Sequence, residues 1–98
     1  MIEVVEVYDW TIRKIKLPNN EKPTSYVCGM IDGFESAVSE VVKSYNPESG
    51  MVITKDEKIY VLNGKPRSPY VVNAEWQKWA YLNGMDPMCR YKKVRRAI

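Results

Sequence analysis

Apolar and polar positions alternate over residues 2–17, and this period of two predicts an extended segment. Ile15 and Leu17 fall out of step with the earlier apolar positions, which is the parity change that a β-bulge near Arg13–Lys14 would produce. We therefore expect one long bent strand, and a tight turn near Asp9 between two short strands is the alternative. The apolar residues at the even positions are Ile2, Val4, Tyr8, Trp10 and Ile12.

Hydrophobic residues recur every three or four positions over residues 24–45, a spacing typical of an amphipathic helix. Thr24 or Ser25 can begin this helix by accepting a hydrogen bond from an early backbone N–H. Asn46–Pro47 ends it, because the residue before a proline avoids the α conformation. One face of the predicted helix carries Val27, Met30, Ile31, Phe34, Ala37, Val38, Val41, Val42 and Tyr45.

Two glycines, Gly29 and Gly33, lie four residues apart inside this predicted helix. Each glycine in a helix interior costs about 1 kcal/mol relative to alanine. We interpret the pair as a place where another backbone comes close, either that of the sheet or that of a second subunit.

The segments Met51–Thr54 and Ile59–Leu62 are rich in β-branched and aromatic residues, and each predicts a strand. Lys55–Lys58 joins them as a hairpin. The chain between this hairpin and residue 70 contains two prolines, which keep it irregular. Tyr70–Val72 then predicts a short edge strand.

Start and stop signals near the C-terminus predict one or two short helices. Asn73 can cap a helix from Ala74 to about Leu82, and Gly84 suits the position just after its end. Asp86–Pro87 repeats the start signal, because proline is favoured at the first helical position. Met88–Ile98 is then a second short helix, and a final strand is the alternative.

These elements predict a single α+β domain covering residues 1–98. Its small antiparallel or mixed sheet has three to four strands, covered on one face by one long amphipathic helix. One or two short C-terminal helices complete the expected fold.

The positive charge of the chain is concentrated at its C-terminal end. The sequence has 15 basic and 12 acidic residues and a net charge of +3. Residues 87–98 hold five of the basic residues and no acidic one. Lys and Arg neutralise phosphates, and exposed aromatic side chains stack on unpaired bases. The candidate nucleic-acid-binding residues are Arg90, Tyr91, Lys92, Lys93, Arg95 and Arg96, together with Lys78.

A second basic group lies in the N-terminal strand and in the loop after the predicted hairpin. These cations would extend one positive surface if the edge of the sheet adjoins the C-terminal segment. Trp76 and Trp79 are expected in the core, because their spacing places them on one side of a helix. The second group consists of Arg13, Lys14, Lys16, Lys65 and Arg67.

Several catalytic chemistries lack the residues they need. The sequence has no histidine, which removes Ser–His–Asp and Cys–His catalysis and most zinc sites. Cys28 and Cys89 fit no zinc spacing and are read as reduced thiols. Asp56–Lys58 pairs a carboxylate with a lysine as metal-dependent nucleases do, but a hairpin turn favours the same residues. We expect no enzyme activity, no cofactor and no metal.

No apolar run approaches the roughly 18 residues that a membrane-spanning helix needs, and the N-terminus does not have the form of a signal peptide. We expect a cytoplasmic protein with no membrane contact.

Three functions fit these observations. The leading hypothesis is a small non-enzymatic binding module that contacts nucleic acid through its basic, aromatic-rich C-terminal segment. The second is a protein-interaction factor that inhibits or tethers a larger partner, such as a phage- or virus-encoded accessory protein. The third is a homo-oligomer, for example a homodimer, that sequesters a small anionic ligand.

Overall fold

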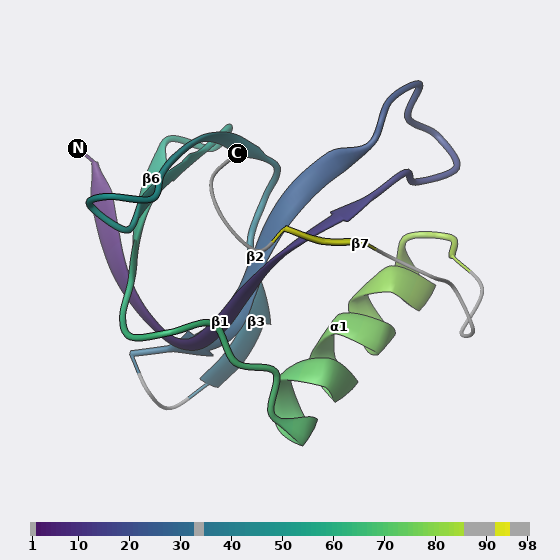
Figure 1. Ribbon diagram of the computed structural model, residues 1–98. Helices are drawn as coiled ribbons and strands as arrows, with labels where there is room; N and C mark the ends of the chain where they lie inside the picture. The colour runs from purple at the N-terminus through teal and green to yellow at the C-terminus, as the bar shows by residue number, and fades with distance from the viewer. Residues whose placement is uncertain (1, 33–34, 86–91, 95–98) are drawn as a thin grey trace.

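The computed structural model describes residues 2–32, 35–85 and 92–94, the last three by their backbone (Figure 1). The described chain forms seven strands and one helix. In chain order these are β1 Glu3–Ile15, β2 Thr24–Ile31, β3 Glu35–Val38, β4 Val42–Asn46, β5 Met51–Thr54, β6 Lys58–Leu62, α1 Tyr70–Leu82 and β7 Lys92–Val94.

The strands form one mixed sheet in the order β3-β2-β1-β6-β5-β4, and β7 pairs with β1 outside this path. The first half of β1 pairs with β6 in parallel, and all other pairs are antiparallel. The expected small sheet under one long helix is therefore wrong, because the described chain is mostly sheet with the single short helix α1 beside β1, β2 and β3 (Figure 1).

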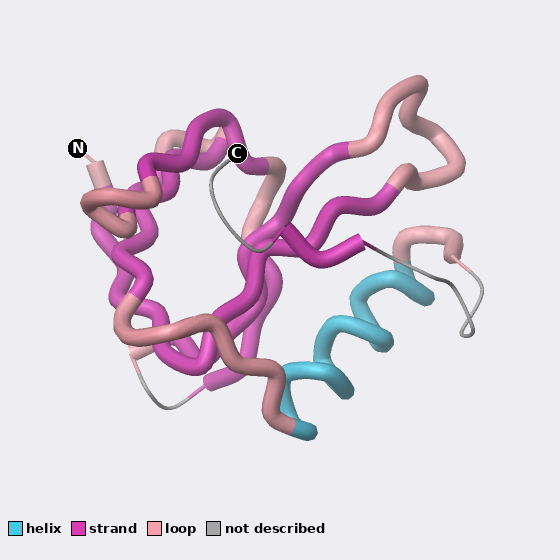
Figure 2. The backbone as a smooth tube through the Cα atoms, viewed as in Figure 1, coloured by secondary structure: helices cyan, strands magenta, loops and turns pink. Residues whose placement is uncertain are grey.

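The two ends of the strand order are joined by only three residues, since β3 ends at Val38 and β4 begins at Val42. The hydrogen-bond ladders continue through this link. Ser39 N donates to Val27 O on β2 at 2.8 Å, and Lys55 N donates to Val41 O at 2.9 Å. The sheet therefore curls until its edges meet, and Figure 2 shows the resulting ring of strands.

The long strand β1 is bent where its register with β2 shifts, between Tyr8 and Thr11. Asp9 adopts a φ of 50° at this point. The shift changes which positions face the interior of the ring: Val5 and Val7 lie inside before it, and even-numbered residues lie inside after it. The single bent strand is confirmed, but the bulge predicted near Arg13–Lys14 is in the wrong place.

The predicted even-numbered apolar face of β1 is also wrong for its first half. Ile2, Val4 and Tyr8 are exposed, while Val5 and Val7 are buried. From Trp10 to Arg13 both faces of β1 are covered, one by the ring interior and one by α1, so alternation alone does not identify the inside.

The long helix predicted over residues 24–45 is wrong, because this segment forms β2, β3 and β4. β2 is buried on two faces: Val27 packs inside the ring, whereas Tyr26 and Cys28 pack towards α1. The loops between the strands interrupt the period-two pattern. The apolar residues of the whole segment then recur at spacings of three and four, as they would in a helix. Asn46 does end its element, and its side-chain oxygen accepts from Glu48 N at 2.9 Å in the following turn.

The close backbone approach predicted at Gly29 is confirmed, although the residue lies on a strand. A Cβ at this position would lie 2.6 Å from Val7 Cγ1 and 2.9 Å from Tyr8 O. The bend of β1 therefore passes directly over Gly29, and no side chain fits between them.

The hairpin of β5 and β6 is confirmed, with its turn after Thr54. The helix predicted from Ala74 is confirmed as α1 but begins at Tyr70, with Pro69 at the N-cap. The edge strand predicted over Tyr70–Val72 is wrong, since these residues form the first turn of that helix. Asn73 does not cap α1, and Gly84 after its end has the positive φ expected, 90°.

Two apolar clusters hold the molecule together. The first fills the ring and contains Val5, Val7, Trp10, Ile12, Val27, Val52, Tyr60 and Leu62. The second joins α1 to the outside of the sheet through Ile15, Tyr26, Cys28, Val72 and Trp76. Trp79 lies against this second cluster, 4.6 Å from Tyr26 between ring centroids, so both tryptophans of α1 lie in or against the core as expected.

The short helix predicted over Met88–Ile98 is not observed where the structure describes this segment. Lys92–Val94 forms β7, which is the alternative of a final strand. The residues on either side, 86–91 and 95–98, lie outside the described part of the chain.

Candidate functional site

The basic C-terminal segment returns to the N-terminal strand. β7 pairs antiparallel with the second half of β1, and Lys92, Lys93 and Val94 are the register partners of Lys14, Arg13 and Ile12 respectively. This contact joins the two basic groups of the sequence at one edge of the sheet. The edge therefore adjoins the C-terminal segment, which is the condition stated above for one positive surface.

Three segments line the same edge of β1 one after another. β6 pairs with Glu3–Val7. The loop after β6 continues along the same edge by two backbone hydrogen bonds of 2.9 Å, in which Asn63 N donates to Val7 O and Arg67 N donates to Trp10 O. β7 then pairs with the last part of the strand. The loop with exposed Lys65 and Arg67 therefore precedes β7 along one edge.

At the end of β1, beyond Ile12, one face of the strand is covered and the other is open. Thr11, Arg13 and Ile15 are buried on the side of α1. Lys14 lies on the opposite face and is exposed, as is Lys16 just beyond the strand. The open face therefore presents two lysines next to the edge that β7 occupies.

Lys14 and Lys92 stand directly opposite each other across the β1–β7 pair. Like charges at directly opposed positions destabilise a sheet. Within residues 2–32 and 35–85, Lys14 and Lys16 form no ion pair. Arg67 differs, because its guanidinium lies 3.1 Å from the Asp9 carboxylate.

Arg13 does not belong to the positive surface, although the sequence placed it there. Its side chain is fully buried between β1 and α1. Nε donates to Thr11 Oγ1 at 3.0 Å and Nη2 donates to Asn73 Oδ1 at 2.6 Å. The guanidinium carbon also lies 5.3 Å from the centre of the Trp76 ring. Arg13 therefore connects the sheet to the helix.

The residues predicted to bind nucleic acid fall into three groups. Lys92 and Lys93 form part of β7, beside Lys14. Lys78 is exposed on α1, which lies on the other side of β1 from the open lysine face. The remaining four lie outside the described residues: Arg90, Tyr91, Arg95 and Arg96.

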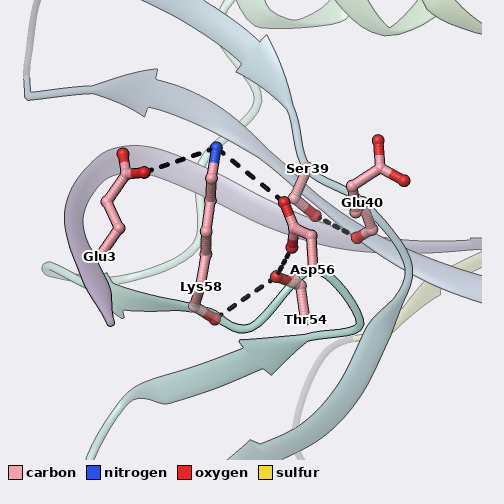
Figure 3. A network of polar contacts seen from close by, with 6 residues as sticks. All are labelled: Glu3, Ser39, Glu40, Thr54, Asp56 and Lys58. Carbon is pink, nitrogen blue, oxygen red and sulfur yellow. Dashed lines mark hydrogen bonds and ion pairs between the residues drawn. The ribbon is translucent and has the colours of Figure 1, made fainter. Parts of the chain in front are cut away.

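The other end of β1 is acidic (Figure 3). Lys58 Nζ lies 3.8 Å from Glu3 Oε1 and 3.9 Å from Asp56 Oδ2, and the Thr54 hydroxyl donates to Asp56. Burial raises the pKa of Tyr60 to about 12, and the nearby carboxylates of Asp56, Glu3 and Glu40 add to the shift. These carboxylates are distant in sequence. The pairing of β1 with β6 brings Glu3 next to the turn that holds Asp56, and Glu40 comes from the link between β3 and β4.

The carboxylate and lysine of the hairpin turn thus belong to a surface ion-pair network. In the described part of the chain, no group of three or more acidic or cysteine side chains is placed to hold a metal ion. Thr54 explains the residue type at Asp56, because its buried hydroxyl donates to that carboxylate within the turn.

A further surface feature is an apolar outer face on the ring, which sequence reasoning missed because the β1 bend was misplaced. Val4, Ile59 and Ile53 form one row across β1, β6 and β5, and Val61 and Met51 form most of the next. All these side chains are at least partly exposed, and Val4 is 58% exposed.

Comparison with family models, with curated proteins and with solved structures finds nothing that matches this chain. Among the described residues, no helix has both the length and the apolar character to cross a bilayer. Functional inference therefore depends on the geometry of the molecule itself.

Proposed function

We propose that this protein is a non-enzymatic module that binds nucleic acid through the basic edge formed by β7 and the second half of β1. The observation that carries the proposal is the register of this pair, in which Lys92 lies opposite Lys14. A polyanion relieves the repulsion between two such cations, and it releases its own counterions as it binds.

The distribution of charge along β1 supports the same function. Glu3 at the start of the strand lies among carboxylates, whereas Lys14 and Lys16 at its end lie away from any ion-pairing partner in the described chain. A molecule with opposite charge at its two ends orients a polyanion towards the basic end. The flanking segments 87–91 and 95–98 add three arginines to that end in sequence.

The test is a titration of labelled duplex DNA and single-stranded RNA at several salt concentrations. The unmodified protein is expected to bind, with an affinity that falls steeply between about 50 and 200 mM salt. Lys14→Ala should reduce the slope of log affinity against log salt by about 0.9 on duplex DNA, the contribution of one phosphate contact.

Lys43→Ala is the matched control, because Lys43 is a surface lysine that pairs with Glu57 at 3.8 Å on the far side of the ring. It removes the same charge and should leave the slope unchanged. Absence of binding to either nucleic acid at low salt would exclude the proposed function. Equal effects of the two variants would exclude this location for it.

A second candidate function is self-association through the apolar outer face of β1, β6 and β5, with a second copy of this chain as the partner. In a two-fold contact the same surface meets itself, so a charged face would place like charges together. The centre of this face is uncharged. At its margin Glu6 accepts a hydrogen bond from Asn63 Nδ2 at 2.8 Å, and Lys58 forms an ion pair with Glu3.

Sedimentation equilibrium over a wide range of protein concentration tests this candidate. The unmodified chain should move from monomer to dimer as concentration rises, and Val4→Lys should remain monomeric because it places a charge in the contact. Val71→Lys is the control, since Val71 is a comparably exposed valine, 47%, on α1. A chain that stays monomeric at every concentration rules out the dimer.

A further inference from the structure

The basic edge has two faces, and they differ in what they offer a ligand. Building on the nucleic-acid function proposed above, we propose that the ligand is held only by its phosphodiester backbone, on the face of β1 and β7 that points away from α1. The bases are neither stacked nor read, so binding does not depend on sequence.

The two faces of β1 differ in what covers them. Arg13 is on the α1 side, as its hydrogen bond to Asn73 of the helix shows. Successive residues of a strand point to opposite faces, so Lys14 is on the open side. The open face continues on β2 with Ser25, the register partner of Lys14. Nearer the bend the same face turns into the ring, where Ile12 packs against Val27, so only its end beyond Ile12 is polar and cationic.

The faces of β7 follow from its pairing with β1. Residues directly opposite each other in an antiparallel pair belong to the same face. Position 92 is opposite Lys14 and belongs to the open face, whereas position 93 is opposite Arg13 and belongs to the α1 side. Positions 92 and 93 of β7 therefore belong to opposite faces of the pair.

The aromatic side chains that stacking would need are not exposed on the described part of this face. Trp10 lies on the same face nearer the bend, but it is buried inside the ring. Tyr70 and Tyr81 are exposed on α1, and Tyr8 is exposed on the first half of β1. Trp76 and Tyr26 are buried between the helix and the sheet. Among the described residues, the open face thus has cations for phosphates and no exposed ring for a base.

Contacts made only to phosphates position a nucleic acid but carry no sequence information. Their strength follows from charge and salt alone. Both duplex and single-stranded nucleic acid can be bound in this way. The slope of log affinity against log salt should be larger for duplex DNA, about 0.9 per phosphate contact, than for single strands, about 0.7.

The experiment compares Lys92→Ala with Lys93→Ala in the full chain, using two duplexes of unrelated sequence and one single strand. Lys92→Ala should lower the salt slope on duplex DNA by about 0.9, and Lys93→Ala should leave it unchanged. The two duplexes should bind with equal affinity. Tyr81→Ala should bind the single strand as the unmodified protein does.

Lys14→Ala provides an independent measurement on the same face and should match Lys92→Ala in its effect on the slope. Equal losses from Lys92→Ala and Lys93→Ala would overturn the inference, as would weaker binding by Tyr81→Ala or a clear preference between the duplexes. Each of those outcomes leaves nucleic-acid binding in place. If the unmodified protein showed no salt-dependent binding at all, the proposed function itself would be excluded.

Discussion

The buried polar residues next to α1 show how single side chains connect the elements of this fold. Arg13 Nη2 donates to both Asn73 of the helix and Ser68 of the preceding loop. Thr11 accepts from Arg13 and its hydroxyl also lies 3.2 Å from Cys28 Sγ. A buried charge is retained when hydrogen bonds compensate its loss of water. Arg13, although it is next to Lys14 in the sequence, therefore has a structural role.

Tyr60 gives a direct readout of the acidic end of the molecule. Its pKa is raised from 10.0 to about 12 by burial and by the carboxylates around it. In a spectroscopic titration of the folded protein, the phenol of Tyr60 should therefore ionise near pH 12. Tyr60→Phe should remove this step from the titration curve.

The same shift affects stability with a definite sign. Below about pH 10 the phenol is neutral in the folded and the unfolded chain, so it adds no pH dependence there. As the pH rises from 10 to about 12, the unfolded chain releases this proton more readily and folding becomes less favourable. Tyr60→Phe should lose less stability over this interval in urea unfolding, and an unchanged loss would contradict the assignment.

At the scale of elements, sequence patterns correctly predicted the elements whose formation depends on neighbouring residues in the chain. The β5–β6 hairpin and α1 follow from β-branched runs and a helical spacing of tryptophans, and both are present. Residues 24–46 show the limit of this reasoning. Val27 faces the ring and Cys28 faces α1, so both faces of β2 are apolar and the period-two signal disappears.

The candidate site was predictable in composition but not in arrangement. The sequence identified Lys92 and Lys14 as members of two basic groups, yet their contact depends on a pairing between residues that are far apart in the chain. It also placed Arg13 on the surface, because a charged residue next to Lys14 resembles another surface cation. The second layer that covers Arg13, helix α1, is a tertiary feature.

At the scale of the whole molecule, β1 connects two regions of opposite charge. Glu3 and its neighbouring carboxylates lie at one end, and Lys14 with Lys92 lies at the other. The molecule measures 33 × 28 × 26 Å along its principal axes. This size exceeds the Debye length of about 8 Å at physiological salt and is comparable to the value of about 30 Å at 0.01 M.

The two ends should therefore influence each other only at low ionic strength. Glu3→Gln removes one exposed carboxylate, 62% of whose side chain is accessible, without touching the basic edge. We expect this variant to bind duplex DNA more tightly than the unmodified protein at about 0.01 M salt and equally at 0.15 M, because screening removes the repulsion. An increase of the same size at both salt concentrations would mean that Glu3 lies within the contact itself, and the nucleic acid would then have to reach the acidic end of β1.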